Sequence, residues 1–389
     1  MSARELIDEH GSPLWLADVD RFAVNLRAFE AVWKRHWLRT RIAYSYKTNR
    51  LLPLLHAAEA GAASPEVVCG AEFELAAVVV EADPRKIILD GPAKPDWLLA
   101  RAGTLGALVI IDSEEELERA ADAGVARVGL RVALDSFTGA PTRFGIPPDQ
   151  IVAAARSAAR CGLSVQALST HLVSTDFEPA TDRIVVSWPR EPGEHARAAA
   201  LLAQLAAELA AVSVEIGEID LGGGLPPARA VEDHAREVAA ALRARGFAGG
   251  LVLEPGRALV ADAVDLAFSV VAVKSLADGT RCLVCDAGTN FLPGAVYSPP
   301  RIEAPEITGT LAPTLVTGPL CLNVDVVHPD AQLPEVMPGA LLVARDVGAY
   351  QQVASTEFGE PLPAVAVRRH GRWSLHGRAH RNQLEHQAV

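Results

Sequence analysis

The feature that most restricts the fold of this sequence is a regular alternation of short apolar runs with helical patterns between residues 25 and 257. Strands that alternate with helices predict a parallel sheet, because each helix carries the chain back to start the next strand in the same direction. We expect strands at residues 41–46, 65–68, 86–90, 107–112, 126–134, 163–172, 218–222 and 251–255. About eight such units in roughly 230 residues are typical of a closed (β/α)8 barrel, with an open doubly wound sheet as the alternative.

The segments between these runs carry helical signals, for example at residues 71–82, 113–124 and 148–162. The last has Asp149 near its start and Gly162 just past its end, as helix termini favour. From residue 258 the helical periodicity fades, and short apolar runs alternate with Pro and Gly clusters. This pattern predicts a C-terminal antiparallel β domain after the barrel.

Composition excludes several classes of partner. The net charge is -12, and no long basic run occurs before residues 368–381, which we expect to be a solvated terminus. Nucleic acid and anionic membrane are therefore not expected as partners. The most apolar stretch, residues 198–214, is interrupted by Gln204 and Glu208 and predicts a buried amphipathic helix, not a membrane span.

The five cysteines and an N-terminus without a signal-peptide pattern predict a reducing, cytoplasmic location. Cys282 and Cys285 form a lone CxxC in an apolar run, with no second pair and no nearby His. A structural role is expected for them, and no metal site is expected in the chain.

Polar residues recur where the predicted barrel strands end, and chemistry in such barrels occurs at the C-terminal ends of the strands. Singly, each has an ordinary explanation, such as a surface lysine, a structural histidine or a tight glycine turn. Together they supply an amine, an anion-binding turn, a flat ring and carboxylates. The set is Lys47, Glu66, Glu72, Asp90, Arg131, His171, Gly222, Gly223, Gly224, Glu254 and Arg257.

Lys47 is notable because the chain has only five lysines among 36 basic residues. A partly buried lysine can lose its proton and form an imine with an aldehyde, which arginine cannot do. Pyridoxal phosphate needs such a lysine for its aldehyde, backbone N–H groups for its phosphate and a carboxylate for its ring nitrogen. The predicted cofactor is therefore pyridoxal 5'-phosphate.

The motifs that carry these residues are AYSYKTN (43–49), EVVCGAE (66–72), STHLVS (169–174), DLGGGLP (220–226), EPGR (254–257), GPLCLNVD (318–325) and DVGAYQQVASTEFG (346–359). In their order and spacing, the chain resembles the fold-type III pyridoxal-phosphate decarboxylases, the family of diaminopimelate, ornithine and arginine decarboxylases. The resemblance implies an alanine racemase-like fold. It places a barrel at residues 25–257 and a β domain at residues 1–24 plus 258–389, which contributes to a shared active site in a homodimer.

The resemblance also implies roles for single residues. Lys47 would form the internal aldimine, His171 would stack on the cofactor ring, and Glu254 would pair with its nitrogen. Cys321 would enter the partner subunit's site as the proton donor. The other implied cofactor contacts are Glu66, Gly222, Gly223, Gly224, Gly256, Arg257 and Tyr350.

Glu254 favours decarboxylation over racemisation, because a carboxylate keeps the ring nitrogen protonated and the cofactor a strong electron sink. An amino-acid racemase on the same fold is the main alternative. A catalytically inactive regulatory homologue is a second, and the presence of Lys47, His171 and Cys321 argues against it. A cofactor-carrier protein is a third, and it would lack residues 258–389.

The expected substrate pocket departs from the best-known relatives. Leu322 stands where diaminopimelate enzymes usually have a glutamate for the distal ammonium, and FLPGAVY (291–297) lacks their arginine for the distal carboxylate. We therefore expect meso-diaminopimelate, lysine and ornithine to be poor substrates, since a buried ammonium without its carboxylate is costly. An amino acid or conjugate in siderophore, polyamine or natural-product biosynthesis is expected instead. The predicted substrate contacts are Tyr297, Leu322, Asn323 and Asp325.

One further segment, residues 175–194, follows the stacking histidine and is unusual for the family. It is either a lid or a surface insertion, and we favour the surface insertion.

Overall fold

The computed structural model describes residues 1–178 and 181–378. Contacts within the chain define two compact units. One is Asn25–Ala258, and the other joins Met1–Val24 to Leu259–Val389.

The first unit is a closed barrel of parallel strands, as predicted, and the alternative of an open sheet is wrong. The barrel closes because β10 pairs with both β7 and β11, and β11 pairs with β2. Around the barrel the strands are β2 (Thr40–Ser45), β3 (Ser64–Val67), β4 (Ile88–Leu89), β5 (Leu108–Ile111), β6 (Arg127–Arg131), β7 (Ser164–His171), β10 (Glu218–Gly222) and β11 (Gly250–Glu254). Each expected apolar run overlaps one of them.

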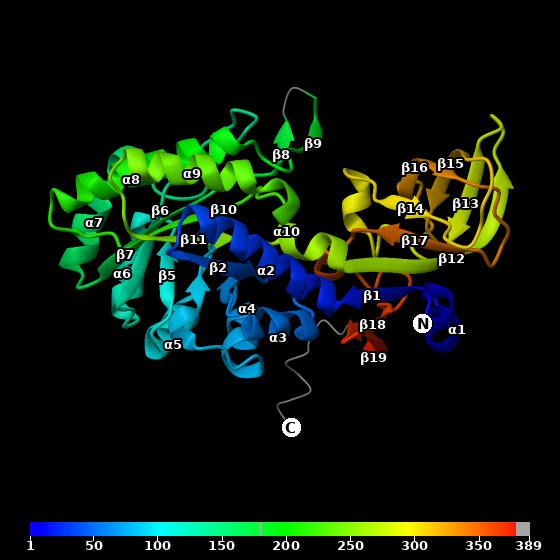
Figure 1. Ribbon diagram of the computed structural model, residues 1–389, viewed down its shortest axis with the longest axis horizontal. Helices are drawn as coiled ribbons and strands as arrows, with labels where there is room; N and C mark the ends of the chain where they lie inside the picture. Colours follow the sequence, from blue (N-terminus) through cyan, green and yellow to red (C-terminus); the bar gives the residue numbers. More distant parts are fainter. Residues whose placement is uncertain (179–180, 379–389) are drawn as a thin grey trace. The chain divides into compact units, whose positions relative to one another are not determined.

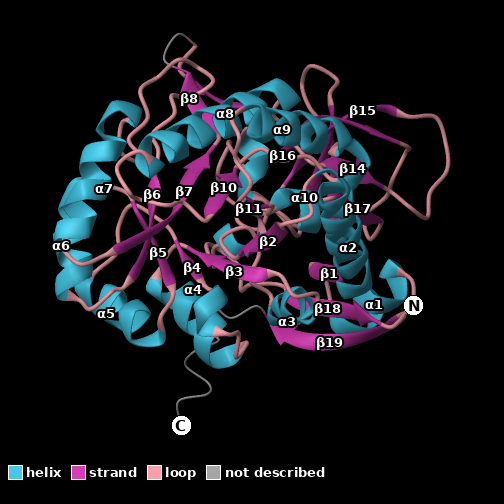
Figure 2. Cartoon of the chain, turned by 60° about the vertical axis from the view of Figure 1, so that its left-hand side comes forward, coloured by secondary structure: helices cyan, strands magenta, loops and turns pink. Residues whose placement is uncertain are grey.

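Helices cover the outside of the barrel, and Figure 2 shows α5, α6 and α7 along its outer wall. The main helices are α2 (Val19–His36), α3 (Leu52–Ala60), α4 (Gly70–Glu74), α5 (Asp96–Leu105), α6 (Glu114–Asp122), α7 (Ile151–Arg160), α8 (Pro192–Ala210) and α9 (Glu232–Ala244), and a short α10 (Arg257–Val260) follows β11. Small and branched side chains fill the barrel interior, where Ala43, Ile88, Ile110 and Val252 belong to one buried cluster. This packing supports the strand ends that carry the polar residues.

Two local features differ from the expectations. The helix expected at residues 71–82 is a short α4 followed by a π-helical turn, Leu75–Val79. Such turns are frequent near functional sites. The segment after the stacking histidine forms a hairpin of β8 (Thr175–Glu178) and β9 (Arg183–Val186). Arg190 is only 6 % exposed, so a surface insertion describes the hairpin but not Arg190.

The second unit is built on a sheet of mixed direction (Figure 1). Most neighbours are antiparallel, but β1 pairs with β18 and β13 with β15 in parallel. Its elements are α1 (Ala3–His10), β1 (Leu14–Asp18), β12 (Val264–Ser275), β13 (Arg281–Cys285), β14 (Arg301–Glu303), β15 (Ala312–Thr317), β16 (Val326–Leu333), β17 (Leu341–Arg345), β18 (Ala364–Arg369) and β19 (Arg372–Arg378). Apolar residues of α1, β1, β12 and β17 form its core.

Residues 369–372 and 374–376 are exposed, as expected of a solvated terminus, but residues 368–378 are not an irregular tail. They belong to β18 and β19, which pair as an antiparallel hairpin at the edge of this sheet. Asp18 pairs with Arg368, and Asp20 accepts hydrogen bonds from the amides of His370 and Gly371. Residues 379–381 lie outside the described residues.

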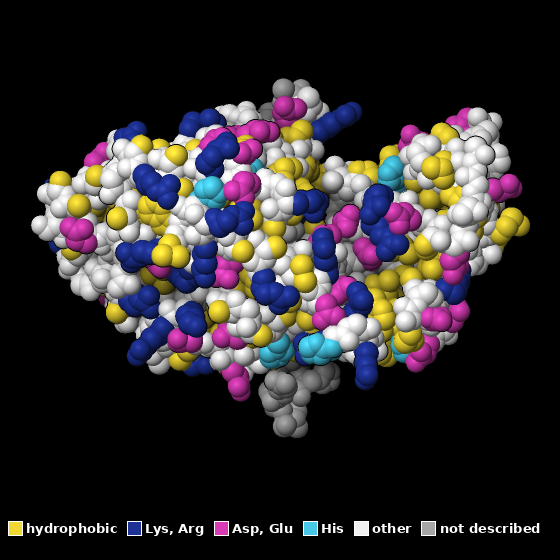
Figure 3. All heavy atoms as spheres, in the orientation of Figure 1, with side chains coloured by type: hydrophobic (Ala, Val, Ile, Leu, Met, Phe, Trp, Pro, Cys, Tyr) yellow, Lys and Arg dark blue, Asp and Glu magenta, His cyan; other side chains and the backbone are white. Residues whose placement is uncertain are grey.

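Within the part of the chain that is described, no helix is both long enough and apolar enough to cross a membrane. The apolar stretch at 198–214 lies largely in α8, whose buried face includes Leu202, Leu205 and Leu209. On the face drawn in Figure 3, basic and acidic side chains are interspersed. Cys282 and Cys285 are both buried in β13, three residues apart, so their side chains point to opposite faces of the strand.

Candidate active site

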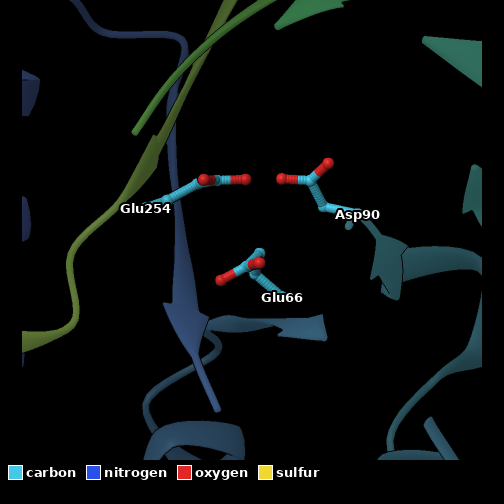
Figure 4. A group of neighbouring side chains, drawn as sticks. All are labelled: Glu66, Asp90 and Glu254. Atoms are coloured by element: carbon cyan, nitrogen blue, oxygen red, sulfur yellow. The ribbon is translucent and has the colours of Figure 1, made fainter. Parts of the chain in front are cut away.

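The predicted residues at the strand ends gather at one end of the barrel. The ends of β3, β4 and β11 carry Glu66, Asp90 and Glu254, which are buried and lie within 4.8 Å of one another. Figure 4 shows their carboxylates pointing toward a common centre. Lys47 follows β2, Arg131 and His171 end β6 and β7, and Gly222 ends β10.

Lys47 is held by a buried carboxylate. Its Nζ donates to Oε1 and Oε2 of Glu66 at 2.7 and 2.8 Å, and the hydroxyl of Ser45 also donates to Glu66. Burial raises the pKa of Glu66 and the ammonium of Lys47 opposes that shift. The Lys47 side chain keeps 26 % of its surface exposed.

Arg131 lies between two acids of the same barrel end. Its Nη1 is 3.4 Å from both Asp90 and Asp112, and its guanidinium lies over the ring of Phe144. Burial would raise the pKa of Asp90, but Arg131, Lys47 and nearby donors outweigh burial and hold that pKa below its ordinary value.

The three clustered carboxylates are a donor set that could hold a cation. Here the ammonium of Lys47 and the guanidinium of Arg131 already supply positive charge to Glu66 and Asp90. The arrangement is therefore explained without a metal ion.

His171 and Glu254 face each other, with Nδ1 3.3 Å from Oε2. Burial, together with Lys47 and Arg131, lowers the pKa of His171 to about 3, so its ring is neutral at physiological pH. Burial raises the pKa of Glu254 to about 7, with Lys47 opposing the shift. The result is a neutral, flat imidazole beside an acid that titrates near neutrality.

Asp220 is a functional candidate to which the sequence analysis gave no role. It lies in β10 beside Val252 of β11, two residues below Glu254. Both of its carboxyl oxygens, and Oε1 of Glu254, are buried without a donor among the described residues. Burial and the charge of Glu254 raise the pKa of Asp220 well above its ordinary value. A proton on the Asp220 carboxyl would give that group a donor toward a neighbouring carboxylate.

The glycine turn after β10 requires the absence of side chains. A Cβ at Gly222 would lie 2.3 Å from Nδ1 of His171 and 2.4 Å from Oε2 of Glu254. Gly223 and Gly224 have φ of +80° and +69°, in the left-handed region that favours glycine. Such a turn leaves backbone N–H groups available for an anion.

Residues 188–190 donate hydrogen bonds to this turn. The sequence did not indicate these contacts. The amide of Arg190 donates to the carbonyl of Gly224 at 2.9 Å, and Nε1 of Trp188 donates to the carbonyl of Leu225 at 3.1 Å. Arg190 is itself fixed by Glu194 and by the carbonyl of Val173. The guanidinium of Arg257 lies 5.2 Å from the Trp188 ring centre.

Two other predicted residues lie close to this barrel end. Gly256 allows close packing, because a Cβ there would lie 2.0 Å from the hydroxyl of Thr48. Glu72 is buried at the start of α4 and accepts a hydrogen bond from the amide of Val68.

The remaining predicted residues belong to the second unit. Cys321, Leu322 and Asn323 are exposed in one loop. Asp325 is buried in that loop, and its carboxylate accepts from the amides of Thr289 and Leu320, so it shapes the loop.

Tyr297 and Tyr350 lie in two other turns of this unit. Tyr297 follows a short 3-10 helix and is partly exposed. Tyr350 has a φ of +63°, a strained conformation of the kind found at functional turns.

Comparison with known proteins identifies close relatives of the whole chain. Residues 24–261 match the family described as pyridoxal-dependent decarboxylase, pyridoxal binding domain. The diaminopimelate decarboxylase of Deinococcus radiodurans is 31% identical over 378 residues, covering 94% of this chain and 92% of that protein.

Solved structures show the same fold at lower identity. Diaminopimelate decarboxylase from Helicobacter pylori, complexed with L-lysine, superposes with a TM-score of 0.84 at 21% identity over 100% of both chains. Lysine decarboxylase from Selenomonas ruminantium superposes with a TM-score of 0.79 at 20% identity over 94% of each chain.

Proposed function

Because the chain belongs to the pyridoxal-dependent decarboxylases, we propose that it is the decarboxylase of an amino acid or amino-acid conjugate other than meso-diaminopimelate, lysine or ornithine. Members of this family are carboxy-lyases that use pyridoxal phosphate. The proposal is supported by the gathering of Lys47, Glu254 and the glycine turn at one end of the barrel. It is supported also by the apolar Leu322 in the expected substrate motif.

The residues of the barrel end fit pyridoxal phosphate. Lys47 offers a reachable amine for the aldehyde, and the turn at Gly222–Gly224 offers backbone N–H groups for the phosphate. Arg257 and Tyr350 are the further phosphate contacts in this proposal. Bound pyridoxal phosphate supplies an electron sink for the pair left when the α-carboxylate departs.

In this proposal Glu66 orients Lys47. Its two oxygens hold the amine at 2.7 and 2.8 Å, which fixes Nζ at the end of β2. His171 supplies the flat surface for the ring, and its low pKa keeps that surface neutral.

Glu254 sets the charge of the ring nitrogen, and Asp220 sets the charge of Glu254. The Asp220 carboxyl, kept protonated by burial, donates to Glu254 and favours its ionised form. A carboxylate at this position holds a proton on the ring nitrogen, which favours decarboxylation over racemisation. The comparisons give no support to a racemase.

We assign proton donation after carbon dioxide departs to Cys321. The thiol is exposed in the loop that Asp325 organises, so it is available to a second subunit. A head-to-tail homodimer with shared sites follows from this assignment.

The substrate pocket is proposed from Tyr297, Leu322 and Asn323. Leu322 is 46 % exposed and offers no charge to a distal ammonium. The segment FLPGAVY has no cation for a distal carboxylate. Pairing a charged substrate end with an apolar wall leaves that end without a partner, which weakens binding.

The test is carbon dioxide release by the purified holoenzyme from a panel of amino acids and conjugates. Because a relative 31% identical is a diaminopimelate decarboxylase, meso-diaminopimelate is the first competitor in that panel. We expect another member to be turned over at least about tenfold faster, equivalent to roughly 1.4 kcal/mol. An ordinary rate with meso-diaminopimelate would refute the proposed specificity while leaving the decarboxylase assignment intact.

A pair of variants sharpens this test. Leu322→Glu introduces the missing carboxylate, and Leu322→Gln has nearly the same shape without charge. We expect Leu322→Glu to raise kcat/KM for substrates with a distal ammonium about tenfold over Leu322→Gln, as a charge-assisted hydrogen bond allows. Equal kcat/KM values for the two variants would show that residue 322 does not contact the distal end of the substrate.

A further inference from the structure

The end of the barrel opposite Lys47 contains a second cavity. The first residues of β2, β6, β7 and β10, and the 3-10 helix Pro84–Lys86 before β4, line a space of about 610 Å³. Its basic side chains are Arg39, Arg41, Arg85, Lys86 and Arg127, and its acidic side chains are Glu215 and Glu218. We call it the N-terminal cavity.

The cavity is positively charged in an acidic protein. Five basic and two acidic side chains give it a formal charge of +3, whereas the whole chain carries -12. Polar groups at this end of such barrels usually serve stability, through ion pairs across the strand ends. That role accounts for Arg41, which pairs with Glu218 at 2.7 Å.

The other cations are not explained in this way. Within residues 1–178 and 181–378, Arg39, Arg85, Lys86 and Arg127 form no ion pair with a carboxylate. Arg39 donates to the carbonyl of Ala248, and Arg127 donates to Gln166 and to two carbonyls. These acceptors are neutral, so they orient the guanidinium groups without cancelling their charge.

We propose that the N-terminal cavity is a binding site for a small polyvalent phosphate anion, such as a diphosphate group. Guanidinium groups present paired N–H donors that match phosphate oxygens, and Arg127 is already held in place by three hydrogen bonds. A diphosphate of several negative charges balances the +3 of the cavity. The open mouth leaves the outer oxygens of the anion in water, which lowers the cost of desolvation.

Since β2, β6 and β10 run from this cavity to Lys47, Arg131 and the glycine turn, the two sites lie at opposite ends of the same strands. Occupation of the cavity is therefore separate from occupation of the cofactor site. The anion stabilises the barrel by linking cations that belong to different strands.

The test is isothermal titration of magnesium-free pyrophosphate into the holoenzyme in phosphate-free buffer at low ionic strength. In the holoenzyme the cofactor's phosphate occupies the glycine turn, so added pyrophosphate cannot bind there. We expect one pyrophosphate per chain, with affinity that falls as salt rises, and a higher unfolding temperature. Absence of binding at millimolar pyrophosphate would overturn the proposal.

The variant Arg85→Gln/Lys86→Gln removes two exposed cations of the cavity and is not expected to disturb folding. Its matched control, Arg35→Gln/Arg236→Gln, removes the same charge from exposed helix positions elsewhere in the barrel unit. We expect the cavity variant to weaken pyrophosphate binding at least about tenfold and the control less than about twofold. Equal losses in both, or citrate binding as tightly as pyrophosphate, would show non-specific charge attraction and refute a phosphate site.

Discussion

At the scale of residues, the site depends on charges whose partners are buried with them. The ammonium of Lys47 faces Glu66, and the guanidinium of Arg131 faces Asp90 and Asp112. Removing one member of a buried pair leaves the other uncompensated, which is costly. The Glu254–Asp220 pair differs, because both members are carboxyls and burial raises the pKa of each.

This difference predicts a pH-dependent stability in the protein without cofactor. Burial raises the pKa of Glu254 from 4.5 to about 7. The folded state then keeps a proton that the unfolded chain releases, so the free energy of unfolding falls as pH rises from 4.5 to about 7. Glutamine does not titrate, so the free energy of unfolding of Glu254→Gln should not decrease over this pH range. We therefore expect the variant to be more stable than the wild type above pH 7 by at most roughly 3 kcal/mol.

The measurement is thermal unfolding of the cofactor-free proteins between pH 4 and pH 8, with exposed Glu118→Gln as the control. The advantage of Glu254→Gln should vanish toward pH 4. A difference from the wild type that does not change with pH would contradict the assignment of a buried, protonated Glu254.

The sequence predicted the residues that lie at strand ends, because a parallel barrel brings those ends together whatever the details of packing. It did not predict roles for Asp112 or Asp220. Their importance depends on side-chain directions and on unpartnered oxygens, which no motif encodes. The buried Asp325 illustrates the same limit, since its contacts with Thr289 and Leu320 join separate loops.

At the scale of elements, the segment between β9 and α8 supports the glycine turn. Arg190→Met removes a guanidinium that is fixed by Glu194 and Val173, whereas the aliphatic part of Arg190 packs against Gly224. We expect a loss of about 3 kcal/mol in the free energy of unfolding, as for a broken buried pair, and about tenfold weaker cofactor binding. Arg197→Met, an exposed change on the following helix α8, should leave both unchanged.

Chemical denaturation and titration with pyridoxal phosphate measure these two effects. Normal cofactor affinity in a destabilised Arg190→Met protein would limit the segment to a structural role.

The barrel strands could be predicted because each is a short apolar run bounded by helix or turn signals. The π-helical turn at Leu75–Val79 could not, since a single shifted hydrogen bond leaves no periodicity of its own. The β18–β19 hairpin was missed because basic residues cluster around its turn. Their charge indicated exposure to solvent, but it did not indicate the pairing of β18 with β1.

At the scale of the whole molecule, Lys47 and Cys321 belong to different compact units of the chain. If the thiol serves the partner subunit's lysine, two inactive variants should complement each other. Mixing Lys47→Ala with Cys321→Ala subunits, with exchange between dimers, should restore about a quarter of wild-type activity, because half of the dimers then hold one intact site.

Activity of the mixture no higher than that of the separate variants would contradict shared sites. Size-exclusion chromatography with light scattering is the control, since it shows that the mixed sample is dimeric.

The central claim is that Lys47 holds the cofactor in this barrel, and the absorbance spectrum of the purified protein tests it most directly. With pyridoxal phosphate added and excess removed, the wild type should show a band near about 420 nm, as lysine-bound pyridoxal phosphate does. Lys47→Ala should lack that band, and Lys34→Ala, at an exposed position, should retain it. A wild-type protein without the band, or a Lys47→Ala protein that keeps it, would contradict the account.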